Sequence, residues 1–300
     1  MTQKALFNPS FALVSGVLGV STGAIFVRLA DAPALVTAAY RVGLAVVILI
    51  PVIWWKTKDE FWRLSWFDLG TAVLAGFFLA LHFATWISSL DYTSIANSVV
   101  LVNTTPVWVG LLTPFLTQDR ISSRTVKGIV LSVSGGALIG AEDLVMGGRA
   151  WFGDLLALSG SFCAAGYLLL GRNLRRNLGL LSYTLPCYGS AAVFLWVLVI
   201  LARLPYNGFN THTWAAFVGM AICAQIIGHT SYNYALKWFS ANLIAVSLLG
   251  EPVLATFMGW ILFQEGLTWI KLAGGVLILL GIYLAASGET TKDRGAKIID

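Results

Sequence analysis

The sequence has few charged residues. Asp, Glu, Lys and Arg make up only 11% of its 300 residues, less than half of their usual share in a soluble domain. Apolar residues make up 58%, and the mean hydropathy is +0.80. A soluble core of this length has no room for so much apolar surface. The composition therefore excludes a soluble domain. It predicts a polytopic membrane protein, which has the lipid bilayer as a partner.

Cysteine is also scarce, and the common catalytic motifs are missing. Cys163, Cys187 and Cys223 lie in separate apolar segments, which excludes a disulfide framework or a cysteine metal site. No GxxxxGK[ST] run is present, which argues against direct ATP drive, and neither HExxH nor GxSxG occurs. We expect no catalytic residues, metal or cofactor. An enzyme would need convergent catalytic groups, and the sequence offers no such set. A sensor would need a soluble output domain, and the sequence predicts none.

Apolar runs between charged or turn-rich breaks predict ten membrane-spanning helices, because a span needs roughly 20 mainly apolar residues. The connections are short, so the expected fold is an all-α polytopic membrane protein. The predicted spans cover residues 11–30, 34–55, 67–89, 93–116, 125–141, 151–171, 180–202, 213–236, 240–263 and 269–287.

The basic residues predict the orientation. With a cytoplasmic N-terminus, 14 of the 19 Lys and Arg residues lie in cytoplasmic segments, four lie outside, and Arg41 remains within a span. The positive-inside rule then places both termini in the cytoplasm. The net charge of +5 is explained by these loops, and we expect no nucleic-acid partner.

The chain contains an internal repeat. At an offset of 146 residues, Pro106 matches Pro252, and the matched pairs continue ungapped over about 45 residues. Each half holds five predicted spans, so the second half crosses the membrane in the opposite sense, as in many secondary transporters. The predicted parts are a first five-span repeat at 1–146, an inverted second repeat at 147–287 and a polar cytoplasmic tail at 288–300. The matched pairs are Leu90 with Leu236, Ser94 with Ser240, Gln118 with Gln264, Ser122 with Thr268, Gly128 with Gly274 and Gly135 with Gly281.

Three segments around the matched residues resemble the EamA repeat of the drug/metabolite transporter superfamily. They are Ile87–Ser94 leading to Pro106, Ala235–Ser240 leading to Glu251-Pro252, and Gln264–Thr268. The resemblance covers essentially the whole chain and is greatest to bacterial amino-acid exporters, particularly those of aromatic amino acids. It implies a multi-pass protein of the bacterial inner membrane, with a basket of ten helices around a central cavity.

Glu251 is the one acidic residue far from the end of any predicted span. A polar, proline-interrupted segment at matching points of two halves points to a transporter's substrate site. Glu251 could therefore carry a proton or bind a substrate amine. The alternative is a neutral carboxyl that bonds to the carbonyls freed by Pro252.

Arg41 lies about seven residues into the second span. It could engage a substrate carboxylate or pair with Glu251, or instead reach the outer interface or close an outer gate. His82 and His229 occupy nearly matching places in the two halves. Each could act as a gate or proton relay, or could only hydrogen-bond across helices.

Polar and aromatic residues cluster near these positions. Gln225 and Asn233 stand four residues before and after His229, so an α-helix places them on its face. Rings beside a few polar groups suit an amphipathic solute with a ring or an amine, although packing alone also explains them. The predicted substrate-binding residues are His82, Trp86, Asn103, Trp108, Tyr167, Gln225, Tyr232, Asn233 and Glu251. The predicted gating or coupling residues are Arg41, Pro106, His229, Glu251 and Pro252.

The sequence thus predicts a secondary transporter that exports amino acids and related small metabolites by alternating access. An exporter of cationic drugs or other metabolites with the same fold is the alternative. The protein could be a monomer or a homodimer.

Overall fold

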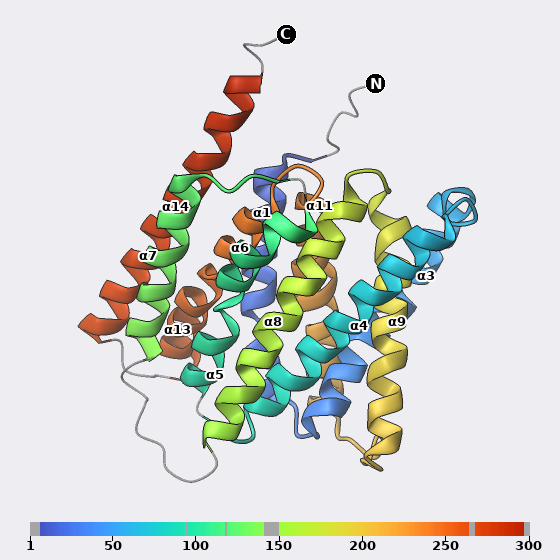
Figure 1. Cartoon of the computed structure of the whole chain (residues 1–300). Coiled ribbons are helices and arrows are strands. Elements are labelled where there is room, and N and C mark those ends of the chain that lie inside the picture. Colours follow the sequence, from blue (N-terminus) through green and yellow to red (C-terminus); the bar gives the residue numbers. More distant parts are fainter. Residues whose placement is uncertain (1–6, 94, 118, 141–149, 264–267, 297–300) are drawn as a thin grey trace. The chain divides into compact units, whose positions relative to one another are not determined.

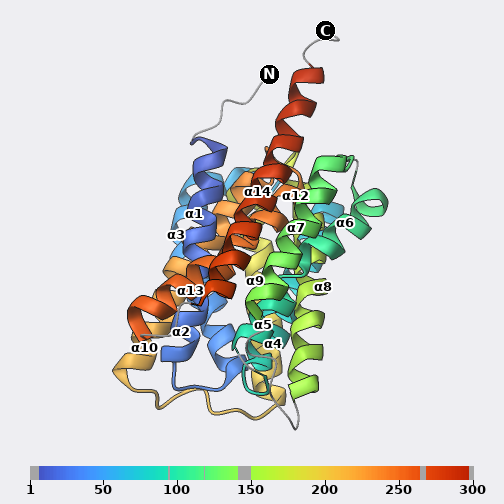
Figure 2. The same ribbon diagram turned by 90° about the vertical axis from the view of Figure 1, so that its left-hand side faces the viewer.

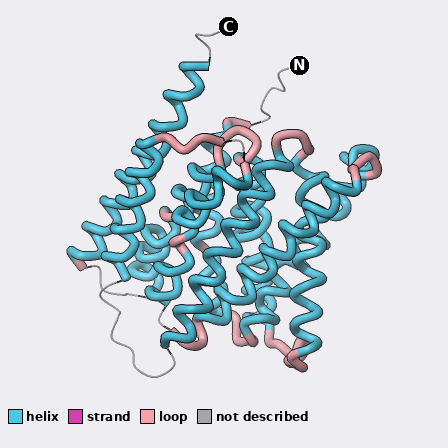
Figure 3. The backbone as a smooth tube through the Cα atoms, viewed as in Figure 1, coloured by secondary structure: helices cyan, strands magenta, loops and turns pink. Residues whose placement is uncertain are grey.

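The computed structural model describes residues 7–93, 95–117, 119–140, 150–263 and 268–296. Within these ranges the regular structure is helical throughout, as Figure 3 shows. The helices are α1 (Pro9–Ser21), α2 (Gly23–Leu29), α3 (Ala34–Phe61), α4 (Trp66–Ser89), α5 (Ile95–Val102), α6 (Thr105–Leu116), α7 (Ser123–Gly140), α8 (Ala150–Arg175), α9 (Leu180–Leu201), α10 (Thr211–Gly219), the π-helix η2 (Met220–His229), α11 (Thr230–Ala235), α12 (Ala241–Leu248), α13 (Gly250–Phe263) and α14 (Trp269–Ala296).

The chain forms two compact units, and each is built from both sequence halves. Unit 1 comprises residues 1–80 and 170–239, and unit 2 comprises residues 81–169 and 240–300. The long helices α4 and α8 each contribute to both units, since the divisions fall at residues 80 and 169. The coarse expectation of an all-helical protein is confirmed.

Among the described residues, seven segments are long and apolar enough to cross a membrane: 9–29, 34–57, 66–89, 98–116, 151–175, 180–201 and 211–235. Two shorter apolar helices, over 241–254 and 272–288, coincide with the ninth and tenth predicted spans. The fifth predicted span is the helix α7. Its first turns carry Arg124 and Lys127, which lower its hydropathy. The total of ten spans stays a prediction.

In unit 1, α3 lies alongside α9, as Figure 1 shows, and α1 packs against η2 and α11. Gly19 of α1 and Gly228 of η2 allow the two backbones to meet. A Cβ atom on Gly19 would stand 2.6 Å from the backbone nitrogen of Gly228. Small residues at such a crossing let membrane helices approach closely, where dispersion forces hold them.

In unit 2, α7 and α14 run side by side, which Figure 1 and Figure 2 both show. A Cβ on Gly128 would stand 2.6 Å from the carbonyl oxygen of Gly281, and one on Gly135 would stand 2.6 Å from that of Gly274. The repeat pairs Gly128 with Gly274 and Gly135 with Gly281, so exchanging the halves maps each contact onto the other. The helices are antiparallel and locally two-fold related, as an inverted repeat predicts.

The centre of this two-fold relation is a single hydrogen bond. The hydroxyl of Ser132 donates to the carbonyl oxygen of Ile278 at 3.2 Å, and these two residues are 146 apart. They are therefore each other's repeat mates. The repeat read from the sequence is reproduced here at the level of individual contacts.

Both predicted proline-containing segments are interrupted helices. The fourth predicted span breaks between α5 and α6, with Pro106 in the first turn of α6. The ninth breaks at Leu249, and Pro252 lies in the first turn of α13. Proline suits the first turn because its missing N–H has no intrahelical partner there.

Candidate functional site

The first group of predicted site residues lies in unit 2, where α8 passes the end of α4. His82 Nδ1 lies 3.0 Å from the carbonyl oxygen of Gly160, a hydrogen bond between the two helices. The rings of His82 and Trp86 are stacked, with centroids 6.0 Å apart and an interplanar angle of 6°. His82 and Trp86 therefore share one face of α4, and His82 makes a hydrogen bond across to α8.

The break before α6 is held by hydroxyl groups. The hydroxyls of Thr104 and Ser161 lie 2.9 Å apart, and Thr105 Oγ1 lies 3.3 Å from the same serine oxygen. Each threonine also donates to a backbone carbonyl three residues earlier. Asn103 is buried, and its side-chain amide donates to the carbonyl oxygen of Val99 at 2.8 Å. These bonds satisfy backbone oxygens that the interrupted helix leaves open.

Two tryptophans in unit 2 have buried indole nitrogens that lack a hydrogen-bond partner within the described residues: Trp86 and Trp108. Trp108 also makes an edge-on contact with Phe162, with ring centroids 5.6 Å apart. A buried donor without an acceptor is uncommon in proteins and calls for an explanation such as a bound molecule. Both residues belong to the predicted substrate-binding set.

The remaining predicted residues of unit 2 are also buried. Glu251 is 8% exposed and lies in the first turn of α13, directly after the break at Leu249. Tyr167 on α8 is 2% exposed. The positive end of the α13 helix dipole favours a negative charge at Glu251.

A second polar group lies in unit 1 around Tyr188, which is fully buried. Arg41 Nε donates to Gln225 Oε1 at 2.9 Å, in a fully buried bond. Asn233 Nδ2 donates to the Tyr188 hydroxyl at 3.1 Å, and that hydroxyl lies 3.3 Å from Thr230 Oγ1. We call these five residues the Tyr188 cluster.

The cluster has one donor left over. Gln225 Nε2 is buried and has no hydrogen-bond partner among the described residues. The bond from Arg41 Nε fixes which side of the amide is the oxygen, since the arginine can only donate. The nitrogen is therefore a second donor of the cluster, beside a cationic side chain and near Tyr188. Carboxylates are the natural partners of such a pair.

The local helix geometry around His229 differs from the expectation. Residues 220–229 form a π-helix, in which Thr230 N bonds to Gln225 O, so Gln225 and His229 are not one α-helical turn apart. The prediction of a regular helix was wrong here, because the sequence carries no marker for the wider turn. Gln225, His229 and Asn233 are nevertheless all buried. π-Helical turns occur frequently at functional sites.

Sequence reasoning missed Tyr188, Thr230 and Ser161, each of which completes one of these polar groups. A signal was available for two of them. Tyr188 follows Cys187, which lies 146 residues after Arg41, and Ser161 follows Gly160, which lies 144 residues after Gly16. Thr230 carries no such mark, because a single threonine in a span most often bonds to its own helix.

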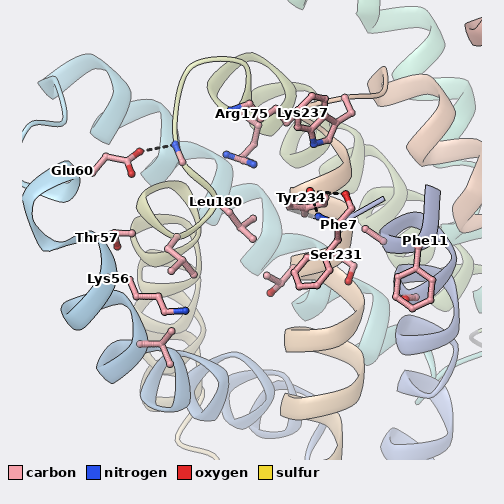
Figure 4. A pocket seen from close by; sticks show the side chains of 17 residues that line it. Phe7, Phe11, Lys56, Thr57, Glu60, Arg175, Leu180, Ser231, Tyr234 and Lys237 are labelled. Atoms are coloured by element: carbon pink, nitrogen blue, oxygen red, sulfur yellow. Dashed lines mark hydrogen bonds between the residues drawn. The ribbon is translucent and has the colours of Figure 1, made fainter. Parts of the chain in front are cut away.

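Unit 1 also contains a pocket of about 770 Å³, shown in Figure 4. Residues of α1, α3, α9 and α11 line it, and Thr230 belongs both to its lining and to the Tyr188 cluster. Within the described residues no group of three His, Cys, Asp or Glu side chains could hold a metal ion.

Curated relatives match most of the chain. A protein of Archaeoglobus fulgidus named "Uncharacterized transporter" is 25% identical over 259 residues, 84% of this chain and 87% of the relative. Another, YyaM of Bacillus subtilis, bears the same description and is 26% identical over 262 residues, 84% of each chain. These relatives are named as transporters, not enzymes.

A solved structure described as "Crystal structure of protein" has a TM-score of 0.77 to this chain at 18% sequence identity. It covers 92% of this chain and 96% of its own length. At that identity the likeness speaks for the fold alone. The EamA-like transporter family matches the sequence twice, over residues 9–141 and 151–287. With both halves matched, the chain is a member of the EamA-like transporter family.

Proposed function

We propose that this protein is a secondary transporter of the bacterial inner membrane that exports amino acids, including aromatic ones, and related small metabolites. Its two inverted repeats of five spans exchange conformations by alternating access, with both termini in the cytoplasm. The interrupted helices beginning at Thr105 and Gly250 place helix N-termini, whose first N–H groups have no intrahelical partner, within the predicted spans, as at solute sites of other transporters.

The observation that carries the amino-acid assignment is the Arg41–Gln225 pair. Arg41 is 1% exposed in a helix that is long and apolar enough to span the membrane. An ionisable group at such a place is retained for function by default, since burying it opposes folding. The guanidinium and the Gln225 amide nitrogen are two neighbouring donors of a kind suited to one carboxylate.

The aromatic part of the assignment rests on unit 2. Trp86 and Trp108 each combine an apolar ring with a buried, open N–H donor. Ligand sites in proteins are mainly apolar and aromatic, with a few polar groups that fix orientation. A solute with an aromatic ring and a polar end matches this chemistry.

The experiment is uptake of radiolabelled phenylalanine, tryptophan, threonine and methionine into proteoliposomes of the purified protein, with and without a pH gradient. We expect saturable uptake of several amino acids, with aromatic ones competing best. Arg41→Gln should lower uptake at least tenfold, because a charged hydrogen bond contributes roughly 1.5–3 kcal/mol. Arg63→Gln removes an exposed charge after α3 and serves as the matched control. Absence of uptake in intact vesicles would refute the assignment.

The second candidate is an exporter of cationic compounds, and the buried Glu251 favours it. Under that hypothesis Glu251→Gln abolishes transport of cations alone. If Glu251 instead couples protons to amino-acid transport, Glu251→Gln keeps substrate exchange and loses the response to a pH gradient. An unchanged response in the variant rules out the coupling role.

A further inference from the structure

The pocket in unit 1 has walls suited to an apolar molecule. Phe11 projects from α1, Val52 lies on α3, and Leu180 and Leu181 begin α9. Figure 4 shows Lys56 pointing from α3 into the space between α3 and α11. A volume of about 770 Å³ falls within the range of small-molecule sites, roughly 300–1,000 Å³.

Its charged groups are mainly cationic. Lys56, Arg175 and Lys237 line the pocket, and Glu60 is the only acidic residue in the described lining. The Glu60 carboxylate already accepts a hydrogen bond from the backbone N–H of Gly179 at 2.6 Å. The lining therefore has an excess of positive charge.

The donors of this lining differ in whether they already have hydrogen-bond or ion-pair partners within the protein. Arg175 is 2% exposed, and its Nε donates to the carbonyl oxygen of Asn233 at 2.8 Å, while Nη1 donates to that of Leu178. Neutral carbonyls hold the guanidinium in place, and the Glu60 carboxylate is the acidic group of the lining that acts on its charge. Trp238 adds a buried indole N–H that has no hydrogen-bond partner in the described part of the chain. Lys56 makes no ion pair with any of the described residues.

One wall is fixed by the N-terminal segment. The Phe7 backbone N–H donates to the Tyr234 hydroxyl at 3.0 Å, and this hydroxyl donates to the Phe7 carbonyl oxygen at 2.9 Å. Figure 4 shows Phe7 beside Tyr234, with Phe11 further along α1. These bonds hold the start of the chain against α11, so the pocket keeps a lateral wall.

We propose that this pocket binds an anionic amphiphile, a molecule with an apolar body and a carboxylate or phosphate group. The apolar body lies among Phe11, Val52 and the first residues of α9, and the anionic group engages Lys56, Lys237 and the Trp238 N–H. The predicted orientation places these basic residues at the cytoplasmic face, where anionic lipid headgroups and soluble metabolites are both present. The site goes beyond the transport function, and binding is measured without transport.

The test measures equilibrium binding to the purified full-length protein by native mass spectrometry. The lipid arm compares dioleoylphosphatidylglycerol with zwitterionic dioleoylphosphatidylcholine. The soluble arm compares 3-phenylpropionate with the uncharged 3-phenylpropanol. We expect the anionic member of at least one pair to bind more tightly, and Lys56→Gln/Lys237→Gln to weaken it roughly tenfold or more.

A second variant tests the pocket volume without changing its charge. Ser231 lines the pocket, so Ser231→Phe should block the apolar body and weaken binding of the same anion. Controls are Lys127→Gln/Arg120→Gln, which removes two exposed charges in unit 2, and Ser159→Phe at a half-buried position of α8 outside the pocket lining. Thermal melts confirm that each variant is folded.

The outcomes separate clearly. Preference for phosphatidylglycerol that both pocket variants abolish assigns a lipid, and preference for phenylpropionate alone assigns a soluble anion. Equal binding of the charged and uncharged members, or equal losses in pocket and control variants, overturns the proposal. Transport of amino acids can succeed or fail independently of this result.

Discussion

Two helix crossings that the repeat makes equivalent are built differently. In unit 1, α1 crosses η2 and α11, and a Cβ on Gly16 would stand 2.7 Å from the ring of Tyr232. In unit 2, α8 crosses α4, and a Cβ on Gly160 would stand 3.0 Å from Thr85 Oγ1 and 3.3 Å from Trp86 Cβ. Tyr232 is 146 residues after Trp86, and Gly160 is 144 residues after Gly16, so a glycine meets an aromatic side chain at both crossings.

The next contact along each crossing differs. In unit 1, Gly19 meets Gly228, and backbone touches backbone. The corresponding residues in unit 2 are Cys163 and His82, too large for such an approach, and the histidine instead bonds to the Gly160 carbonyl. The repeat has thus kept the path of the helices while close packing holds one crossing and a hydrogen bond holds the other.

The largest expected effect is at the packed crossing. A Cβ in Gly19→Ala would lie 2.6 Å from Gly228 N and 2.7 Å from Cys223 O, backbone atoms that move only if the helices separate. We expect a loss of about 1–3 kcal/mol, seen as a lower apparent melting temperature in detergent. Gly136→Ala is the control, because nothing described lies within 4 Å of its Cβ position. Equal melting temperatures for the two variants would contradict the packed crossing.

A smaller effect is expected at the bonded crossing. His82→Phe keeps a ring of similar size but removes the bond to Gly160, whose carbonyl retains its own helical partner. Loss of one such hydrogen bond lowers the free energy of unfolding by about 1 kcal/mol. The variant should melt below the wild type but above Gly19→Ala. A loss greater than that of Gly19→Ala would reverse the comparison.

The smallest effect concerns the residues that follow the two crossing helices, Asp91 and its repeat mate Lys237. Partial burial raises the pKa of the Asp91 carboxyl. Its ionised form is then less favourable in the folded than in the unfolded protein, so stability falls as the pH rises through the folded pKa. Asp91→Asn should melt slightly higher than the wild type at pH 7, and the difference should vanish below about pH 4. A lower melting temperature at pH 7 would contradict this account.

Much of the architecture could be predicted, because apolar composition indicates membrane spans and a constant residue offset indicates a repeat. The breaks near Pro106 and Pro252 followed from the loss of a backbone donor, and the glycines of α7 and α14 from the constant offset. The break at Thr22 and the π-helix over 220–229 were not predictable, since no proline marks either.

The candidate site was only partly readable. Arg41, Gln225 and Asn233 stood out because polar residues are rare in spans. Their connection through Tyr188 depends on tertiary contacts between α9 and the segment around Thr230. An aromatic residue in an apolar helix gives no sign that its hydroxyl lies at the centre of a polar cluster.

The most direct test of the central claim, that Arg41 recognises a substrate carboxylate, is competition against radiolabelled phenylalanine uptake in proteoliposomes. The competitors are unlabelled phenylalanine and phenethylamine, which keeps the ring and amine but lacks the carboxylate. We expect phenylalanine to compete and phenethylamine to fail at a tenfold higher concentration. Arg41→Gln should lower phenylalanine uptake at least tenfold, while Arg63→Gln retains it. Equal competition by phenethylamine, or undiminished uptake by Arg41→Gln, would contradict the account.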